Sequence, residues 1–438
     1  MTVPEPRPAG AFEEFRRSVS AAALGSLGLR LCSILLLFVS QILLTRALGV
    51  AGFGAFAFAL ACVKGLAIAA TFGAERLIVR DVSAYEVRRD WAALRSFLRW
   101  LYGSLLASAT GAALAAASIA WLAAPDALWL PVLWIALALL PLTALLRIAQ
   151  HVLAGLQRPL LAQLPETIVQ PLLFLCAAAA LALAGRLSAE GAMALQVFAA
   201  ALAAVLGLQL LRHTLPGAAA NEAPSQATGR WGSAFSMFVA TGSMTLLAAA
   251  PVLLLGIMSG PEEAGVMAVA RSLADLMLVP LLAFGSVMGP LLGRLWAEGD
   301  REGVQRCFTA FARGSAIAVA PIAIGLFLLR EPLLSLFGEP FGAGAEALSI
   351  LLVGQLAGSL AGSNVLLLST LGHERVVALI SAASLVAGTA ATALLIPAFG
   401  VTGAAAGAAT ASIIWNAALV AATRRLTGLS PGAFARLR

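Results

Sequence analysis

Long apolar runs, separated by short polar stretches, fill most of this 438-residue sequence. Each run is about 20 residues long, which is the length that an α-helix needs to cross the hydrocarbon core of a bilayer. The pattern therefore predicts an all-α membrane protein. The twelve predicted spans are 26–47, 52–72, 100–123, 127–146, 166–185, 190–211, 232–258, 263–286, 310–329, 344–368, 376–396 and 401–423.

The composition supports the membrane assignment. Hydrophobic residues make up 61% of the chain and charged residues only 11%, with a mean hydropathy of +0.95. A soluble globular domain carries about 25% charged residues, so a soluble protein is excluded. Near the N-terminus, Phe12, Phe15 and Val19 recur at helical spacing, which indicates either a short helix on the membrane surface or a disordered tail.

The arginines predict how the spans are oriented. When both termini are placed on one side of the membrane, that side receives 22 arginines and the other side only Arg46, Arg186 and Arg330. Because cytoplasmic loops are enriched in arginine and lysine, the arginine-rich side and both termini are predicted to be cytoplasmic. The net charge of +7 is then explained by the arginines of the cytoplasmic loops and their attraction to anionic lipid headgroups. The sequence has no basic patch with interleaved aromatic residues, so it does not indicate a nucleic-acid partner.

A short segment near the start of the second span recurs near the start of the eighth. AGFGAFAFA at 51–59 aligns with EEAGVMAVA at 262–270, which pairs Gly54 with Gly265 at an offset of 211 residues. This similarity predicts an internal duplication.

A second pair of segments repeats at a similar offset. GLQRP at 155–159 aligns with GHERV at 372–376, an offset of 217 residues. Two similar offsets predict two halves of six helices, and an even number of spans gives both halves the same orientation, related by a pseudo-two-fold axis along the membrane normal. The predicted divisions are a cytoplasmic N-terminal segment (1–25), a six-helix bundle (26–211), a cytoplasmic linker (212–230), a second six-helix bundle (231–423) and a cytoplasmic tail (424–438).

Four stretches of the chain resemble a known family in their order and spacing. They are RALGVAGFGAFAFA at 46–59, the segment 262–302 beginning EEAGVMAVARSLADLML, the segment 333–376 beginning LLSLFGEPFGAGAEAL, and IPAFGVTGAAAGAATA at 396–411. They are similar to the polysaccharide (O-antigen and exopolysaccharide type) flippases of the multidrug/oligosaccharidyl-lipid/polysaccharide exporter superfamily. The resemblance implies two six-helix bundles around a central cavity that opens alternately to either side.

The same resemblance implies a function. Members of the family move undecaprenyl-pyrophosphate-linked oligosaccharides from the cytoplasmic to the periplasmic leaflet of the bacterial inner membrane. The expected partners are this lipid-linked substrate, membrane lipids and other membrane proteins of polysaccharide assembly. No cofactor is expected, and coupling to H⁺ or Na⁺ is an open alternative to uncoupled transport.

Four charged residues lie four or more residues inside the ends of the predicted spans: Arg30, Lys64, Arg271 and Asp275. A charge at the bilayer centre costs about 2.5–3.5 kcal/mol on insertion scales, so such residues usually face a bundle interior or a wet cavity. Arg271 and Asp275 are one turn apart and can form an ion pair. Lys64 is the only lysine of the chain and lies too deep in its span for comfortable snorkelling.

We predict that Arg30, Lys64 and Arg271 line a cationic cavity and bind the substrate pyrophosphate, because guanidinium and ammonium groups bind compact anions well. The resemblance supports this, since the family carries basic residues on the equivalents of the first, second and eighth spans. Asp275 would neutralise Arg271 until substrate or an ion displaces it, and it is a candidate coupling residue. Purely structural alternatives are snorkelling for Arg30, a neighbouring carbonyl or hydroxyl as partner for Lys64, and a stabilising ion pair for Arg271 with Asp275.

Other chemistry is missing from the sequence. It has no G-x-x-x-x-G-K-[ST] phosphate-binding loop and no G-x-S-x-G motif, and its four cysteines and three histidines are scattered without metal-ligand spacing. The favoured function is therefore a transporter and not an enzyme. The alternatives are a drug or organic-cation exporter of the same superfamily, for which carboxylates would be expected in the cavity, a flippase for lipid-linked peptidoglycan precursors, and a membrane-embedded glycosyltransferase, polymerase or ligase.

Overall fold

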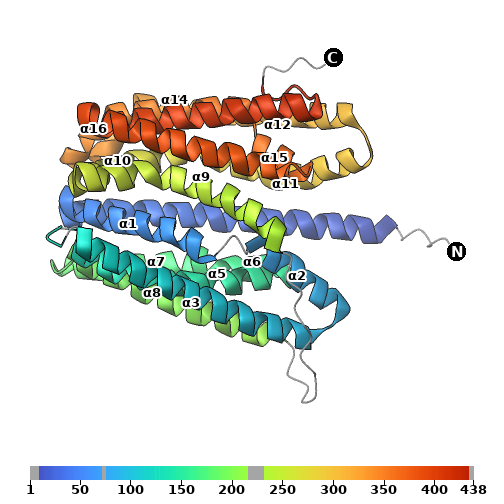
Figure 1. The fold of residues 1–438 in the computed structure, drawn as a ribbon, viewed down its shortest axis with the longest axis horizontal. Coiled ribbons are helices and arrows are strands. Elements are labelled where there is room, and N and C mark those ends of the chain that lie inside the picture. Colours follow the sequence, from blue (N-terminus) through green and yellow to red (C-terminus); the bar gives the residue numbers. More distant parts are fainter. Residues whose placement is uncertain (1–8, 72–74, 124, 128, 216–230, 434–438) are drawn as a thin grey trace.

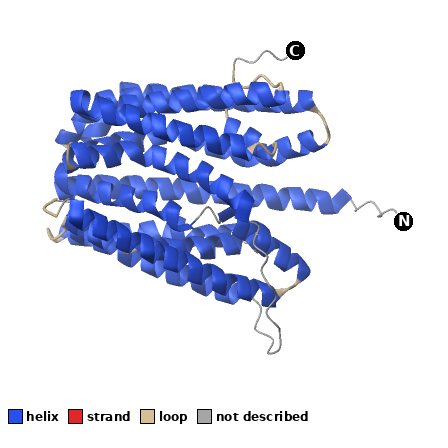
Figure 2. Cartoon of the chain, in the orientation of Figure 1, coloured by secondary structure: helices blue, strands red, loops and turns tan. Residues whose placement is uncertain are grey.

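The computed structural model describes residues 9–71, 75–123, 125–127, 129–215 and 231–433. These residues form helices and turns and no strand (Figure 2), which confirms the predicted all-α class. The helices are α1 (Ala9–Thr71), α2 (Glu75–Arg88), α3 (Trp91–Ala123), α4 (Leu130–Leu137), α5 (Leu139–Gly155), α6 (Pro159–Leu164), the π-helical turn η1 (Pro165–Val169), α7 (Gln170–Leu183), α8 (Ala189–Thr214), α9 (Trp231–Met258), α10 (Pro261–Asp275), α11 (Leu278–Ala297), α12 (Arg301–Leu328), α13 (Arg330–Ser335), the 3₁₀ turn η2 (Glu339–Gly344), α14 (Ala345–Ala361), α15 (Asn364–Thr370) and α16 (Glu374–Thr427).

Nine helical stretches of the described residues are long and apolar enough to cross a membrane. Two of these stretches are double, because α1 turns sharply at Gly49 and α16 turns at Gly400. The consecutive helices α10 and α11 together supply one further span in two pieces. Each of the twelve predicted spans thus has a helix, or a pair of helices, at its place in the chain.

The two sharp turns depend on glycine. Gly49 has φ 70° and Gly400 has φ 53°, a left-handed region in which a side chain would be strained. At each of them the chain passes from one membrane span to the next without a loop.

The turns of the two halves of the chain match at nearly constant offsets. Residues with positive φ recur 210 to 215 positions apart at four corresponding connections. The pairs are Gly49 with Gly260, Arg89 with Gly299, Gln157 with Gly372, and Gly185 with Gly400.

A pair of helix caps repeats in the same way. Asp90 accepts a hydrogen bond from the backbone N–H of Ala93 (3.0 Å), and Asp300, 210 residues later, accepts one from Gly303 (2.7 Å). The same cap therefore begins α3 and α12, as expected for a duplicated unit of six spans.

The helices of each half pack mainly on one another. In the N-terminal half α5 contacts α2, α3 and α8, and in the C-terminal half α16 contacts α9 and α14. The exception is α1, which contacts α3 and α7 but also packs along α9 and α10. In Figure 1 the C-terminal half (yellow to red) lies above α1, and the rest of the N-terminal half (blue to green) lies below it.

Both ends of α1 and both ends of α16 lie toward one end of the bundle (Figure 1), which we call the arginine-rich end, and the turn between the two limbs of each of these helices lies toward the other, the arginine-poor end. The main hydrophobic core joins both halves near the arginine-poor end, with Phe53 and Phe56 packed in one cluster with Val266, Met267 and Phe341 of the other half. Toward the arginine-rich end each half has a core of its own. These cores are built around Val82, Leu94, Leu98 and Val152 in the first half, and around Leu292, Phe308, Phe311 and Leu367 in the second.

Several boundaries differ from the sequence-based expectation: α3 begins at Trp91, α11 ends at Ala297 and α12 begins at Arg301, each beyond the end of its predicted span. Two other differences concern the first and fourth spans. The helix of the first span begins at Ala9 and continues without a break to Gly49, so residues 12–19 extend this helix instead of forming a separate surface helix. The fourth span ends at Gly155 and not near residue 146, because α5 continues past Arg147. Parts of the predicted N-terminal segment, linker and tail (1–8, 216–230 and 434–438) lie outside the described residues.

Candidate functional site

Lys64 lies on the second limb of α1, about 15 residues or roughly 22 Å past the turn at Gly49. Its side chain is exposed, although it lies deep among the helices. The charges that act on it are Asp275 and Arg271 on α10, in the other half, and Arg147 on α5. These groups lie on helices of both halves, so Lys64 is within electrostatic range of charges on either side of the boundary between them.

Arg271 and Asp275 form the ion pair that their spacing predicts. The Arg271 Nε donates to Asp275 Oδ1 at 2.8 Å, and the two side chains are 22% and 41% exposed. The Asp275 oxygen also accepts a hydrogen bond from Gln355 Nε2 on α14, at 3.3 Å. Asp275 thus has partners on two helices, and both members of the pair remain accessible.

Asp275 is the last residue of α10, at a break within the eighth span. Pro280 has no N–H to donate to the carbonyl of Leu276, so the α-helix cannot continue through this point. The chain makes two tight turns instead, from Leu276 N to Leu273 O and from Met277 N to Ala274 O, before α11 begins. Broken helices of this kind at membrane depth are tolerated where they line a cavity or are buried in protein. A proline does not always end a helix in this chain, because Pro251 lies inside α9.

A neutral hydrogen bond joins the two halves one turn from the ion pair. Gln41 Nε2, on the first limb of α1, donates to Ser272 Oγ on α10 at 3.1 Å. Ser272 also donates to the carbonyl of Ala268 at 2.9 Å, so its hydroxyl is held in place from its own helix. The polar groups of α1 and α10 therefore approach each other over more than one turn.

We call Lys64, Arg147, Arg271 and Asp275 the charge cluster. Three cations and one anion give it a formal charge of +2. Such a cluster can bind a compact dianion, with guanidinium forks that match phosphate oxygens and an ammonium that adjusts its position. In the part of the chain that the structure describes, no group of histidine, cysteine or acidic residues could hold a metal ion.

The sequence matches the family described as "Polysaccharide biosynthesis protein" over residues 24–296, well over half of the chain. The chain belongs to this family. No curated protein sequence matches it.

Solved structures of similar fold are transporters of the MOP superfamily. An inward-facing multidrug resistance transporter of the MATE family superposes with a TM-score of 0.69 at 14% identity, over 92% of this chain and 99% of that one. The lipid II flippase MurJ in an inward closed conformation gives a TM-score of 0.65 at 11% identity, over 92% and 87%. An outward-facing MATE family transporter gives 0.58 at 14% identity, over 93% and 96%. This polysaccharide biosynthesis family member therefore has the MOP-superfamily transporter fold.

The structure brings together three of the four residues that the sequence singled out. Arg271 and Asp275 form an ion pair, and Lys64 lies within electrostatic range of both. Arg30 is exposed on the first limb of α1, and none of the contacts given above for the described residues joins it to the charge cluster. The roles of all four in binding or coupling stay predictions.

Two residues of the site escaped the sequence reasoning. The apolar run of the fourth span ends at Leu146, so the sequence pattern places Arg147 in the following loop, yet α5 continues for two more turns and Arg147 lies within electrostatic range of Lys64. Gln355 stands within an apolar run of the tenth span, and that isolated amide was the signal that could have identified it.

Proposed function

We propose that this polysaccharide biosynthesis family member is a flippase that moves undecaprenyl-pyrophosphate-linked oligosaccharide from the cytoplasmic to the periplasmic leaflet of a bacterial inner membrane. The observation that carries the proposal is the charge cluster. A pyrophosphate that links a lipid to a sugar is a diester with a charge of about −2 at neutral pH, which is equal and opposite to the formal charge of the cluster.

The surroundings of the cluster fit a large anionic substrate. Lys64 is exposed and the side chains of Arg271 and Asp275 are partly exposed, so the charged groups can be reached from solvent. They come from α1, α5 and α10, and therefore from both halves, as expected for a site that two halves present alternately to either leaflet. The arginine-rich end is then cytoplasmic by the positive-inside rule, with both termini on that side.

Asp275 provides a way to release the substrate from the cations of the charge cluster. While it is paired with Arg271 and near Lys64, it competes with the substrate for the same cations. Protonation of Asp275, or binding of Na⁺ beside it, would weaken that competition. Coupling to either ion is therefore part of the proposal, and it would act on substrate affinity.

The main alternative is export of an organic cation, in keeping with the multidrug resistance transporters of similar fold. A cation would have to bind beside a cluster that is already positive by two charges, with Asp275 as its carboxylate partner. This arrangement favours an anion on electrostatic grounds.

The test is flipping in proteoliposomes of a fluorescent undecaprenyl-pyrophosphate oligosaccharide, with the wild type compared with Lys64→Gln and Arg271→Gln. We expect both variants to lose at least tenfold in rate while their melting temperatures stay within a few degrees of the wild type. The matched control is Arg294→Gln, because Arg294 forms an i,i+4 pair with Glu298 on an exposed surface, at 2.7 Å against 2.8 Å for Arg271 and Asp275. Normal flipping by both cluster variants, or extrusion of an organic cation by a wild type that is inactive on the lipid, would refute the proposal.

A further inference from the structure

Two glycines that correspond in the internal repeat touch each other at the arginine-poor end. Gly54 lies on the second limb of α1 and Gly265 on α10, at an offset of 211 residues. A Cβ placed on Gly265 would lie 3.0 Å from Gly54 Cα and 2.9 Å from the carbonyl oxygen of Val50. The backbones of the two helices are therefore in direct contact at this point, without side chains between them.

A Cβ added at Gly54 would also meet backbone atoms of the other helix. A Cβ on Gly54 would lie only 1.7 Å from the carbonyl oxygen of Pro261, whereas ordinary contact begins at 3.4 Å. A backbone carbonyl cannot rotate aside as a long side chain can, so the two helices would have to separate by about 1.7 Å. Because Gly54 and Gly265 are equivalent residues of two similar halves, their contact marks the pseudo-two-fold axis.

Other contacts between the halves surround the glycines. Phe38 and Phe337 pack edge to face with ring centroids 5.4 Å apart, and Phe53 and Phe341 do so at 6.0 Å. These pairs join α1 to the segment around η2. The halves are therefore closed against each other at this end, while toward the arginine-rich end each has a core of its own.

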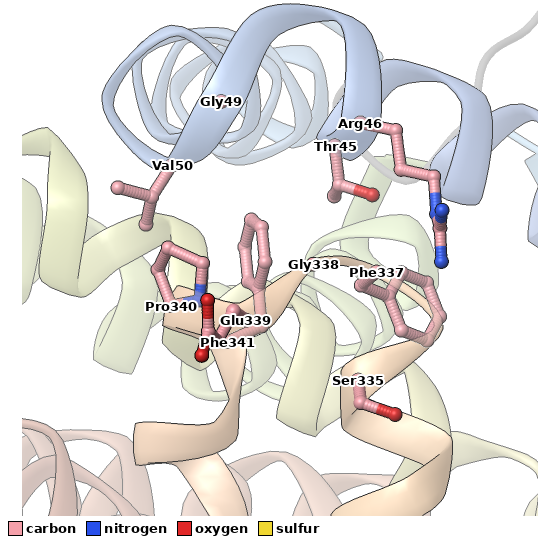
Figure 3. A pocket seen from close by; sticks show the side chains of 10 residues that line it. All are labelled: Thr45, Arg46, Gly49, Val50, Ser335, Phe337, Gly338, Glu339, Pro340 and Phe341. Carbon is pink, nitrogen blue, oxygen red and sulfur yellow. The ribbon is translucent and has the colours of Figure 1, made fainter.

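A cavity of about 400 Å³ remains beside this contact, between the turn of α1 and the chain from Ser335 to Phe341 (Figure 3). Thr45, Arg46 and Val50 line it from the N-terminal half, and Figure 3 shows their side chains across from Phe337 and Phe341. Arg46 Nε donates a hydrogen bond of 2.7 Å to the carbonyl of Leu336, so it crosses from one half to the other. Val50 contributes both a lining side chain and the carbonyl that faces Gly265.

We infer that the Gly54–Gly265 contact is the closing contact of the arginine-poor end, and that side-chain bulk at either glycine holds the exporter away from the conformation described here. The pocket around Arg46, which is open to solvent at its mouth, is then the outer end of the exit path, and it deepens when the glycines part. This inference rests on the proposed alternation between two conformations but not on the identity of the substrate.

The test measures access to the closed end directly. Thr45 is 2% exposed and lies beside the cavity, so the thiol introduced by Thr45→Cys is protected from a membrane-impermeant maleimide while this end is closed. Labelling of the four native cysteines is measured in protein that keeps Thr45 and is subtracted. We expect Gly54→Ala and Gly265→Ala, each combined with Thr45→Cys, to raise the labelling rate about tenfold or more, since overpacking of this size shifts a two-state equilibrium by that order.

The matched control is Gly325→Ala on α12, where an added Cβ has no atom within 4 Å. Two results would overturn the inference: labelling of both glycine variants at the rate of the parent, or an equal rise in the Gly325→Ala protein, which would mean general loosening. Each glycine variant tests the contact from its own side, so either one suffices if the other does not yield folded protein. The assay needs no transport substrate, and a failure of the proposed substrate assignment would leave its outcome unchanged.

Discussion

Replacing Asp275 by asparagine gives the sharpest prediction about the charge cluster, because binding and transport should change in opposite directions. Asparagine has nearly the same shape as aspartate and can still accept the hydrogen bonds from Arg271 and Gln355, but the formal charge of the cluster rises from +2 to +3. A dianion that sits against Arg271 lies roughly 5–8 Å from the carboxylate. Removing that repulsion favours binding by about 1–2 kcal/mol once solvent screening of a 41% exposed side chain is included, or roughly 5- to 30-fold in Kd.

The assay has two readouts. The first is the affinity of purified Asp275→Asn protein for a short-chain polyprenyl-pyrophosphate sugar, which should be tighter than that of the wild type. The second is the flipping rate in proteoliposomes under an H⁺ or Na⁺ gradient, which should fall and lose its dependence on the gradient, because the competing carboxylate no longer helps to release the substrate.

Stability should change little in this variant. An exposed ion pair contributes about 0–1 kcal/mol, so the melting temperature should stay close to that of the wild type. The control is Glu298→Gln, which removes the same kind of pair from Arg294 at the surface and should alter neither affinity nor flipping. Unchanged or weaker binding by a folded Asp275→Asn protein would refute the electrostatic reasoning, and normal transport with unchanged ion dependence would remove Asp275 as a coupling residue.

Three further predictions follow from particular contacts. Arg147→Gln should weaken binding of the pyrophosphate lipid roughly tenfold in a titration, because Arg147 belongs to the charge cluster and acts on Lys64 from α5. An affinity equal to that of the wild type would exclude Arg147 from the site. Asp90→Ala and Asp300→Ala should each lower the unfolding free energy by about 1 kcal/mol in thermal melts, because each removes the N-cap of a long helix. Gly256→Ala should cost about 1–3 kcal/mol, because the added Cβ would lie 2.2 Å from Cδ2 of the buried Phe58 ring, and Phe58→Leu in the same chain should recover part of that loss.

The spans could be predicted from the sequence because lipid imposes a simple requirement. A segment that crosses the bilayer must be apolar and about 20 residues long, and it must satisfy its backbone hydrogen bonds internally. The gaps between the predicted spans, 48–51 and 397–400, contain Gly49 and Gly400, so the sequence located both turns. It did not show that each turn is made at a single glycine of left-handed φ, with helix directly on either side and no loop.

The site was predictable only in part. Lys64, Arg271 and Asp275 stand out because a charge within an apolar run needs a reason to be there. Arg147 does not stand out, because an arginine at the end of an apolar run looks like a loop residue until the length of its helix is known. How the helices pack also decides which charges meet, and hydropathy carries no information on packing partners. Arg30 is also a cation within an apolar run, as Lys64 is. It is not among the charges that act on Lys64, which within the described part of the chain are those of Asp275, Arg147 and Arg271.

The internal repeat carries more information about the site than the two segments used to find it. Extended by ten residues, the alignment that pairs Gly54 with Gly265 pairs Lys64 with Asp275, again at an offset of 211. Residues at equivalent positions of two similar halves approach each other only where their helices run beside the axis that relates those halves. The glycines do so at the arginine-poor end, and the lysine and aspartate do so deeper in the membrane.

The same axis therefore carries a contact without side chains at the closed end and a pair of opposite charges further in. A substrate anion would compete with Asp275 for Lys64 and Arg271, and under the proposed closing contact the exit would open only when Gly54 separates from Gly265, so both events would act on the same two helices. Binding and opening would then be coupled through α1 and α10, and Asp275→Asn and Gly54→Ala should perturb a single equilibrium from its two ends.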